Sequence, residues 1–320
     1  MPGQASYLVL LPRQIALLER SWWFSYRLLV GVLLLGIANF WGFSSPNGFT
    51  KCASIVSVQE LPRAERVDAP YYVDIRDLVG SIPEPPSDSP DRTFVDPDLR
   101  VKYVFGEGKG DCSQRSRALA RQLQIRSIPY RIIWVMHDSE TRSGFGHTVV
   151  ESAIQLDDFR GTAIVDLLEG GVPFGARGPL KLEDLLAHKP FPDHLIKPLA
   201  KWADDESPYY GQFLEDSAVG VSTSDEVNRY ADAMAAWYVD TGYPRFEKLF
   251  YILGAMVFGK YPNVYMTPTE IARFDHWFRF EIFLARALVW TIRILMLMAT
   301  AQMLVTLWNW SRRPSTKART

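Results

Sequence analysis

The chain contains little cysteine, which excludes two classes of protein. Cys52 and Cys112 are the only cysteines among 320 residues. A disulfide-rich scaffold needs more of them, and so does a zinc site made of cysteine alone. The histidines show no paired metal-ligand spacing such as H-E-x-x-H. We therefore expect neither a bound metal nor a cofactor.

The sequence also lacks an excess of charge of either sign. Its 35 Lys and Arg residues and 36 Asp and Glu residues give a formal net charge of −1. A nucleic-acid partner is not expected, because such binding depends on a basic surface. The hydrophobic content of 48% is enough for a core, and the length allows one large domain or two ordinary ones.

Two uncharged apolar runs indicate a membrane protein. The first runs from Leu28 to Phe43, and the second from Ile294 to Trp310. A spanning helix needs about 20 mostly apolar residues, so we expect two transmembrane helices that flank the rest of the chain. A cleaved signal peptide is the alternative for the first run. That run is longer than a usual signal core, and no clean small-x-small cleavage site follows it.

Basic residues near the two runs predict the orientation in the membrane. Arg13, Arg20 and Arg27 precede the first run, and only Lys51 follows it closely. We therefore expect a cytoplasmic N-terminus, an exported main domain, periplasmic or extracellular, and a second span that returns to the cytoplasm. An inverted topology would make the main domain cytoplasmic.

Three arginines before the second run recur every seven residues. Arg279, Arg286 and Arg293 therefore share one face of a helix. Arginine deep in lipid is costly, so this stretch is expected to lie along the membrane surface with its arginines toward lipid headgroups. An ordinary helix packed on protein is the alternative.

Composition divides the chain into six segments. We expect a tail and anchor over residues 1–45, an extended linker over 46–99, a folded core over 100–200, a helical extension over 201–276, an interfacial and transmembrane helix over 277–311, and a basic tail over 312–320.

A glycine-rich bend before Cys112 leads into a predicted helix. Asp111 is a good N-cap, and Gln114 follows three residues later as in a capping box. Cys112 then lies in the first turn, where unpaired N–H groups and the helix dipole favour a thiolate. A phosphate-binding loop is discounted, because Gly110 follows Lys109 where that motif needs Ser or Thr.

Three strands are predicted after this helix, over residues 130–136, 146–156 and from Gly161 to near Asp166. The turn between Leu156 and Gly161 is short enough for an antiparallel hairpin, which makes His147 and Asp166 cross-strand neighbours. A thiol nucleophile needs a base, and the base needs a third group that holds its orientation. Cys112, His147 and Asp166 are therefore the candidate catalytic residues.

Each candidate has an alternative. Cys112 can be a small buried apolar residue, or it can form a disulfide with Cys52. His137 is a second candidate base, but its neighbours read as a loop that leaves a strand. Asp157 and Asp158 compete with Asp166, but a hairpin turn is expected to leave them solvated.

The ordered set of motifs resembles the transglutaminase-like cysteine enzymes, whose fold is similar to that of papain-type proteases. The set comprises the Gly-Lys-Gly-Asp-Cys helix start, the Ile-Pro stop in "RSIPYR", the His on a strand and the Asp at the end of the next. The resemblance implies an α+β fold in which the Cys-bearing helix packs on an antiparallel sheet. It also implies Cys112 as nucleophile, His147 as general base and acid, and Asp166 as the orienting carboxylate.

The reaction implied is acyl transfer from an amide through a thioester, by a cysteine hydrolase or an acyltransferase. The N–H of Cys112 is the natural oxyanion donor; Tyr103 or an amide of Gly106 to Gly110 is a candidate second donor. Expected partners are a peptide or protein amide substrate, membrane lipid, and proteins of a membrane assembly. The alternative function is a non-catalytic scaffold of the same fold in an envelope or polysaccharide assembly.

Overall fold

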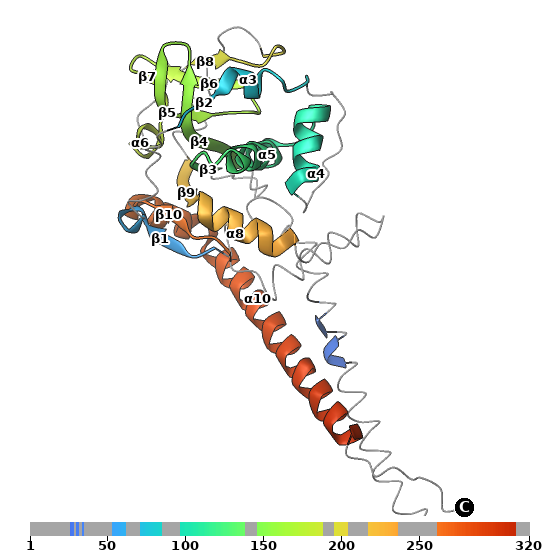
Figure 1. The fold of residues 1–320 in the computed structure, drawn as a ribbon. Helices are drawn as coiled ribbons and strands as arrows, with labels where there is room; N and C mark the ends of the chain where they lie inside the picture. Colours follow the sequence, from blue (N-terminus) through green and yellow to red (C-terminus); the bar gives the residue numbers. More distant parts are fainter. Residues whose placement is uncertain are drawn as a thin grey trace, which may run out of the picture.

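The computed structural model of the chain describes residues 26–28, 30–31, 34, 53–61, 71–84, 97–137, 146–187, 195–203, 217–235 and 261–311. This part has the expected α+β class, with helices packed on a mixed sheet and one long C-terminal helix (Figure 1). In chain order its elements are β1 (Ile55–Ser57), η1 (Val58–Glu60), β2 (Val73–Asp74), α3 (Ile75–Val79), α4 (Pro97–Val101), the π-helix η3 (Lys102–Gly106), α5 (Cys112–Ile125), β3 (Tyr130–His137), β4 (Gly146–Leu156), β5 (Phe159–Val165), β6 (Gly171–Gly175), β7 (Gly178–Pro179), α6 (Leu182–Leu186), β8 (Leu195–Pro198), β9 (Ser217–Thr223), α8 (Ser224–Ala235), β10 (Val264–Met266) and α10 (Pro268–Ser311).

The main sheet has the strand order β1-β10-β9-β3-β4-β2, and β5 also pairs with β4. Most neighbours are antiparallel, but β1 is parallel to β10 and β2 is parallel to β4. The sheet is therefore mixed, and the expectation that it is antiparallel holds only for part of it. Both parallel strands come from the segment expected to be an extended linker. They are three and two residues long, too short for hydrophobic periodicity to reveal them.

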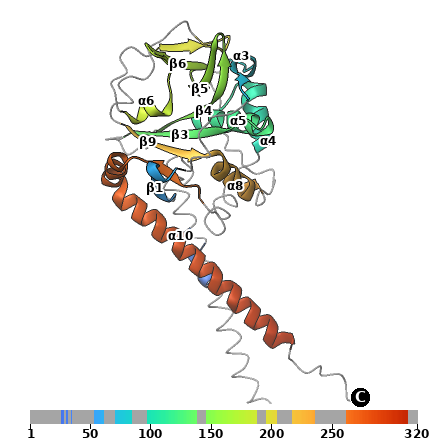
Figure 2. The same ribbon diagram turned by 60° about the vertical axis from the view of Figure 1, so that its left-hand side comes forward.

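Helix α5 packs on one face of this sheet. Its Leu119 and Leu123 join Ile132, Val150 and Ile154 of β3 and β4 in one buried core. The side chains between them along the strands point to the opposite face, as the two-residue period of a strand requires. That face carries a second core, formed with α6, and the small sheet β7-β6-β8 lies beyond β5 (Figure 2).

The expected helical extension over residues 201–276 contains two strands as well as a helix. Strand β9 lies between β10 and β3, and all seven of its residues are buried. Its sequence, "SAVGVST", is buried on both faces, so it shows none of the alternation that identifies a half-exposed strand. Helix α8 begins at Ser224 within the expected region.

Helix α10 is one continuous helix of 44 residues, where a surface-lying helix followed by a span was expected. Phe274, Ile282 and Ala285 in its first half are buried. The guanidinium of Arg286 donates a hydrogen bond to the carbonyl oxygen of Ala53 at 3.0 Å. One side of the first half of α10 therefore packs on protein, while the expected contact of its arginines with lipid headgroups stays a prediction.

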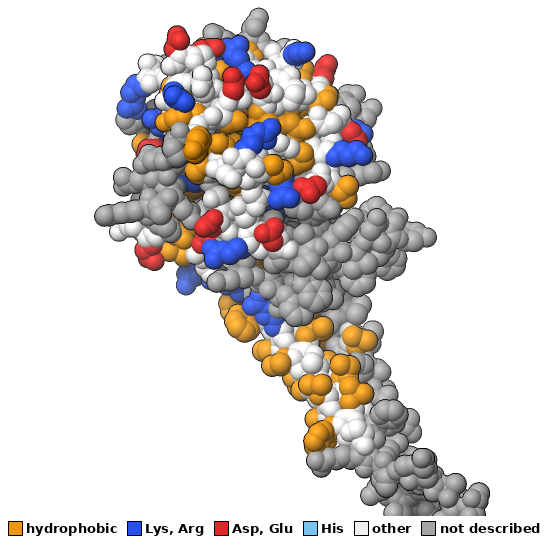
Figure 3. All heavy atoms as spheres, viewed as in Figure 1, with side chains coloured by type: hydrophobic (Ala, Val, Ile, Leu, Met, Phe, Trp, Pro, Cys, Tyr) orange, Lys and Arg blue, Asp and Glu red, His pale blue; other side chains and the backbone are white. Residues whose placement is uncertain are grey.

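The second half of α10 projects from the folded body and exposes apolar side chains (Figure 3). Leu297 is 70% exposed and Trp308 is 58% exposed. Within the described residues, α10 is the one helix that is long and apolar enough to cross a membrane, where two spans were expected. The first expected span, residues 28–43, lies almost entirely outside the described residues, as does the basic tail.

Candidate active site

The predicted helix start before Cys112 is confirmed. The Asp111 carboxylate accepts a hydrogen bond from the backbone N–H of Gln114 at 2.7 Å, so Asp111 is the N-cap and Cys112 is the first residue of α5. The Cys112 N–H belongs to the first helical turn, where amides have no acceptor within the helix. That N–H group and the positive end of the helix dipole both lie beside the sulfur.

The first turn of α5 docks against an edge of β4 that β5 leaves open. The β4–β5 pairing begins only at Val150. Before that point, the Cys112 thiol lies 3.7 Å from the carbonyl oxygen of Gly146, and the Ser116 hydroxyl donates to the Thr148 carbonyl oxygen at 2.6 Å. Buried carbonyl groups at the open edge of a sheet need hydrogen-bond donors from elsewhere. Their pairing with α5 holds Cys112 next to the start of β4, where His147 lies.

The predicted hairpin brings His147 and Asp166 together. Strands β4 and β5 are antiparallel, with Val150 opposite Val165. This register makes His147 and Asp166 diagonal neighbours on one face. His147 Nε2 lies 2.6 Å from Asp166 Oδ2, and the two side chains are 6% and 0% exposed. The expected cross-strand contact is confirmed.

The turn after β5 holds the Asp166 carboxylate in place. Its Oδ1 accepts hydrogen bonds from the backbone N–H groups of Leu168 at 2.9 Å and Glu169 at 3.2 Å. Backbone bonds also join Asp166 to Gly171 in both directions. Because Oδ1 is occupied by the turn, Oδ2 is directed at the imidazole.

The surroundings of His147 favour its protonated form. Burial alone lowers the pKa of this ring. The negative charge of Asp166 and its hydrogen bond oppose that effect, and a hydrogen bond to Cys112 adds to them, so the pKa rises to about 10. Since Nε2 contacts Asp166, Nδ1 is the nitrogen that remains for the sulfur.

The structure describes only some of the residues that compete with the triad. Cys112 is a half-buried thiol outside any disulfide, while Cys52 lies outside the described residues. His137 is the last residue of β3, and its side chain is likewise outside the described part. Asp157 lies at the surface in the β4–β5 turn, where it pairs with Arg76 and Lys197.

Two of the backbone amides suggested as a second oxyanion donor already donate hydrogen bonds to the backbone of the preceding π-helix. The Gly108 N–H donates to the Val104 carbonyl oxygen at 3.0 Å, and the Lys109 N–H donates to that of Tyr103 at 3.3 Å. These bonds stabilise the glycine loop itself. The Cys112 N–H stays a candidate oxyanion donor, and so do the amides of Gly106 and Gly110.

Sequence reasoning missed Arg115. Its side chain is 1% exposed, although arginine is seldom fully buried. It lies one turn after Cys112 on α5, on the side that faces the glycine loop. That spacing of three residues was the available signal, because residues three apart on a helix are neighbours.

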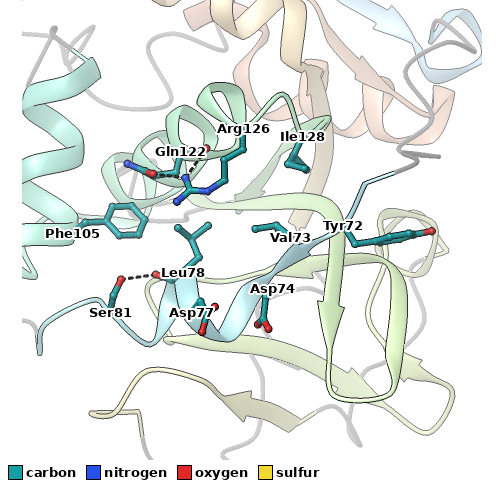
Figure 4. A pocket seen from close by; sticks show the side chains of 10 residues that line it. All are labelled: Tyr72, Val73, Asp74, Asp77, Leu78, Ser81, Phe105, Gln122, Arg126 and Ile128. Atoms are coloured by element: carbon teal, nitrogen blue, oxygen red, sulfur yellow. Dashed lines mark hydrogen bonds between the residues drawn. The ribbon is translucent and has the colours of Figure 1, made fainter.

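A separate groove of about 550 Å³ lies between α3 and the far end of α5 (Figure 4). Its lining includes Gln122, ten residues after Cys112. At about 1.5 Å of rise per helical residue, this is about 15 Å along α5, so the groove does not contain the candidate triad. Across the described ranges, no group of His, Cys, Asp and Glu residues is arranged to hold a metal ion.

A comparison of the chain with protein-family models, curated proteins and solved structures finds no match.

Proposed function

We propose that the chain is a membrane-anchored cysteine hydrolase or acyltransferase, similar to the transglutaminase-like enzymes, that acts on an amide bond. One observation carries the proposal: a buried His147–Asp166 pair at 2.6 Å lies next to Cys112, the first residue of helix α5. A nucleophile, a base and an orienting acid in this order are what thiol acyl transfer requires.

The first half of the reaction forms a thioester. The Cys112 thiolate attacks the amide carbonyl carbon, and the Cys112 N–H stabilises the oxyanion that develops. His147 donates its proton to the departing nitrogen, the C–N bond breaks, and an amine or ammonia leaves. Asp166 keeps the imidazole oriented and stabilises its charge throughout.

The second half of the reaction regenerates the enzyme. His147, now neutral, takes a proton from water or from a second amine as that molecule attacks the thioester carbonyl. The C–S bond breaks, and Cys112 leaves as the thiolate. Water gives a carboxylic acid, and an amine gives a new amide.

Two contacts link described residues of the N-terminal part to α10, the candidate membrane anchor. The Arg27 guanidinium donates to the Gln302 side-chain oxygen at 2.9 Å. The Arg286 guanidinium donates to the Ala53 carbonyl oxygen at 3.0 Å, nearer the start of α10. The basic residues before Leu28 favour a cytoplasmic N-terminus and an exported main domain.

An acyl probe tests the proposal on the full chain in detergent micelles. A small activated ester should acylate Cys112, as peptide mass spectrometry will show, and the adduct should decay faster when an amine is added if the enzyme is a transferase. Cys112→Ala should lose the adduct, and His147→Ala should form it much more slowly. If both variants are acylated to the same extent and at the same rate as wild type, the non-catalytic scaffold is favoured instead.

A further inference from the structure

Arg115 is a buried cation that joins the two loops of the candidate site. Its Nε donates to the Gly110 carbonyl oxygen at 2.8 Å, and its Nη2 donates to that of Gly108. Its Nη1 donates to the Leu167 carbonyl oxygen at 3.0 Å. Gly108 and Gly110 belong to the loop before Cys112, whereas Leu167 directly follows Asp166.

The glycine loop presents its carbonyl groups in a conformation that few residues can adopt. Gly108 and Gly110 have φ values of +69° and +111°. A Cβ at Gly108 would lie 2.6 Å from the backbone oxygen of Pro83, and one at Gly110 would lie 2.9 Å from the Gln114 side-chain oxygen. The positive φ therefore favours glycine at both positions, and at Gly108 the fixed backbone oxygen also leaves no room for a Cβ. The loop is built so that its carbonyl oxygens meet the guanidinium.

Trp202 covers the guanidinium from another side. Its ring centroid lies 5.7 Å from Arg115 Cζ, and its indole N–H donates to the Ile82 carbonyl oxygen at 3.2 Å. Gly170, with φ of +69°, makes room for this ring, because a Cβ there would lie 2.8 Å from it. Water is thus kept from the three bonds of Arg115, which strengthens them.

We propose that Arg115 is a positioning residue that sets the place of Cys112 relative to Asp166. The inference rests on the proposed function. A planar guanidinium spreads five donors over three nitrogens in a fixed fork, which suits three carbonyl oxygens on two loops, whereas the three donors of a lysine ammonium share one nitrogen. Through Gly110 it holds the backbone two residues before the nucleophile, and through Leu167 the backbone one residue after the orienting acid.

The test compares Arg115→Lys with a matched buried arginine. Arg131 of β3 is 5% exposed and donates to the Glu151 carboxylate of β4 at 3.1 Å. The rate of Cys112 alkylation by iodoacetamide at pH 7 and the melting temperature are measured for both variants. A shift of about 1 Å can cost about 100-fold in rate. Arg115→Lys should therefore lower the alkylation rate of Cys112 at least about tenfold. Arg131→Lys should have a lower melting temperature, but its alkylation rate should stay within about twofold of wild type.

The outcomes separate this inference from the proposed function. A wild-type Cys112 that reacts no faster than glutathione refutes the proposed function. A reactive wild type with a folded, equally reactive Arg115→Lys overturns the role of Arg115, and so does an equal loss of rate in both variants. If Arg115→Lys fails to fold, the alkylation rate of Cys112 is measured in Trp202→Ala. A loss of rate smaller than about tenfold supports the inference, and a rate equal to that of wild type overturns it.

Discussion

Replacing Asp166 by Asn should lower the pKa of His147 by about three pH units. The amide keeps the size of the side chain but removes the charge that lies 2.6 Å from Nε2 in a buried site. An opposite charge at such a distance typically changes a pKa by about 1–3 units, and full burial favours the upper end. Three units correspond to about 4 kcal/mol of preference for the imidazolium. At pH 8, the protonated fraction should fall from about 99%, for a pKa of about 10, to about 10%.

The pKa is measured by NMR on protein with ¹⁵N-labelled histidine, titrated from pH 5 to 11 in micelles. The His147 signal is identified by its absence in His147→Gln. A matched control, Asp157→Asn, removes a surface carboxylate of the same hairpin and should leave the titration unchanged. If Asp166→Asn keeps a His147 pKa above 9, the carboxylate does not hold the proton on the ring, and the electrostatic argument fails.

Three further predictions concern stability. Gly108→Ala should cost about 1–3 kcal/mol, because it forces alanine into a left-handed conformation against the Pro83 carbonyl; chemical denaturation measures the loss. Glu270→Ala should cost a similar amount, about 1–3 kcal/mol, because the buried Val219 N–H loses its acceptor, and α10 should show faster hydrogen exchange near its start. The proton on His147 should stabilise the fold fully below pH 6.5, and this contribution should be lost as the pH rises toward 10. The loss is about 1.4 kcal/mol per pH unit. Between pH 6.5 and 10, the melting temperature of wild type should therefore approach that of His147→Gln. A difference in melting temperature that stays constant over this pH range would contradict the prediction.

Local patterns were sufficient for the centre of the candidate site. Asp111 is the N-cap because its carboxylate suits that position, and this places Cys112 in the first turn. Alternation and a short turn gave the β4–β5 hairpin, whose register brings His147 and Asp166 together. Each of these features depends on residues close in sequence, so a single sequence contains the information.

Features that depend on contacts between residues far apart in the sequence could not be predicted from the sequence. β1 pairs with β10 across about 200 residues, and neither strand is long enough to show a period. Burial of Arg115 depends on carbonyl groups from two separate loops and on the ring of Trp202. The contact of Arg286 on α10 with Ala53 likewise joins residues far apart in sequence, and the repeat of arginines gave no sign of it.

The most direct test of the central claim is the rate of Cys112 alkylation by iodoacetamide at pH 6, in wild type and in His147→Ala. If an imidazolium held by Asp166 keeps the sulfur ionised, wild-type Cys112 should react at least about tenfold faster than glutathione at this pH. The His147→Ala variant should lose that advantage. A wild-type rate equal to that of glutathione, or an equal rate in both proteins, would contradict the account.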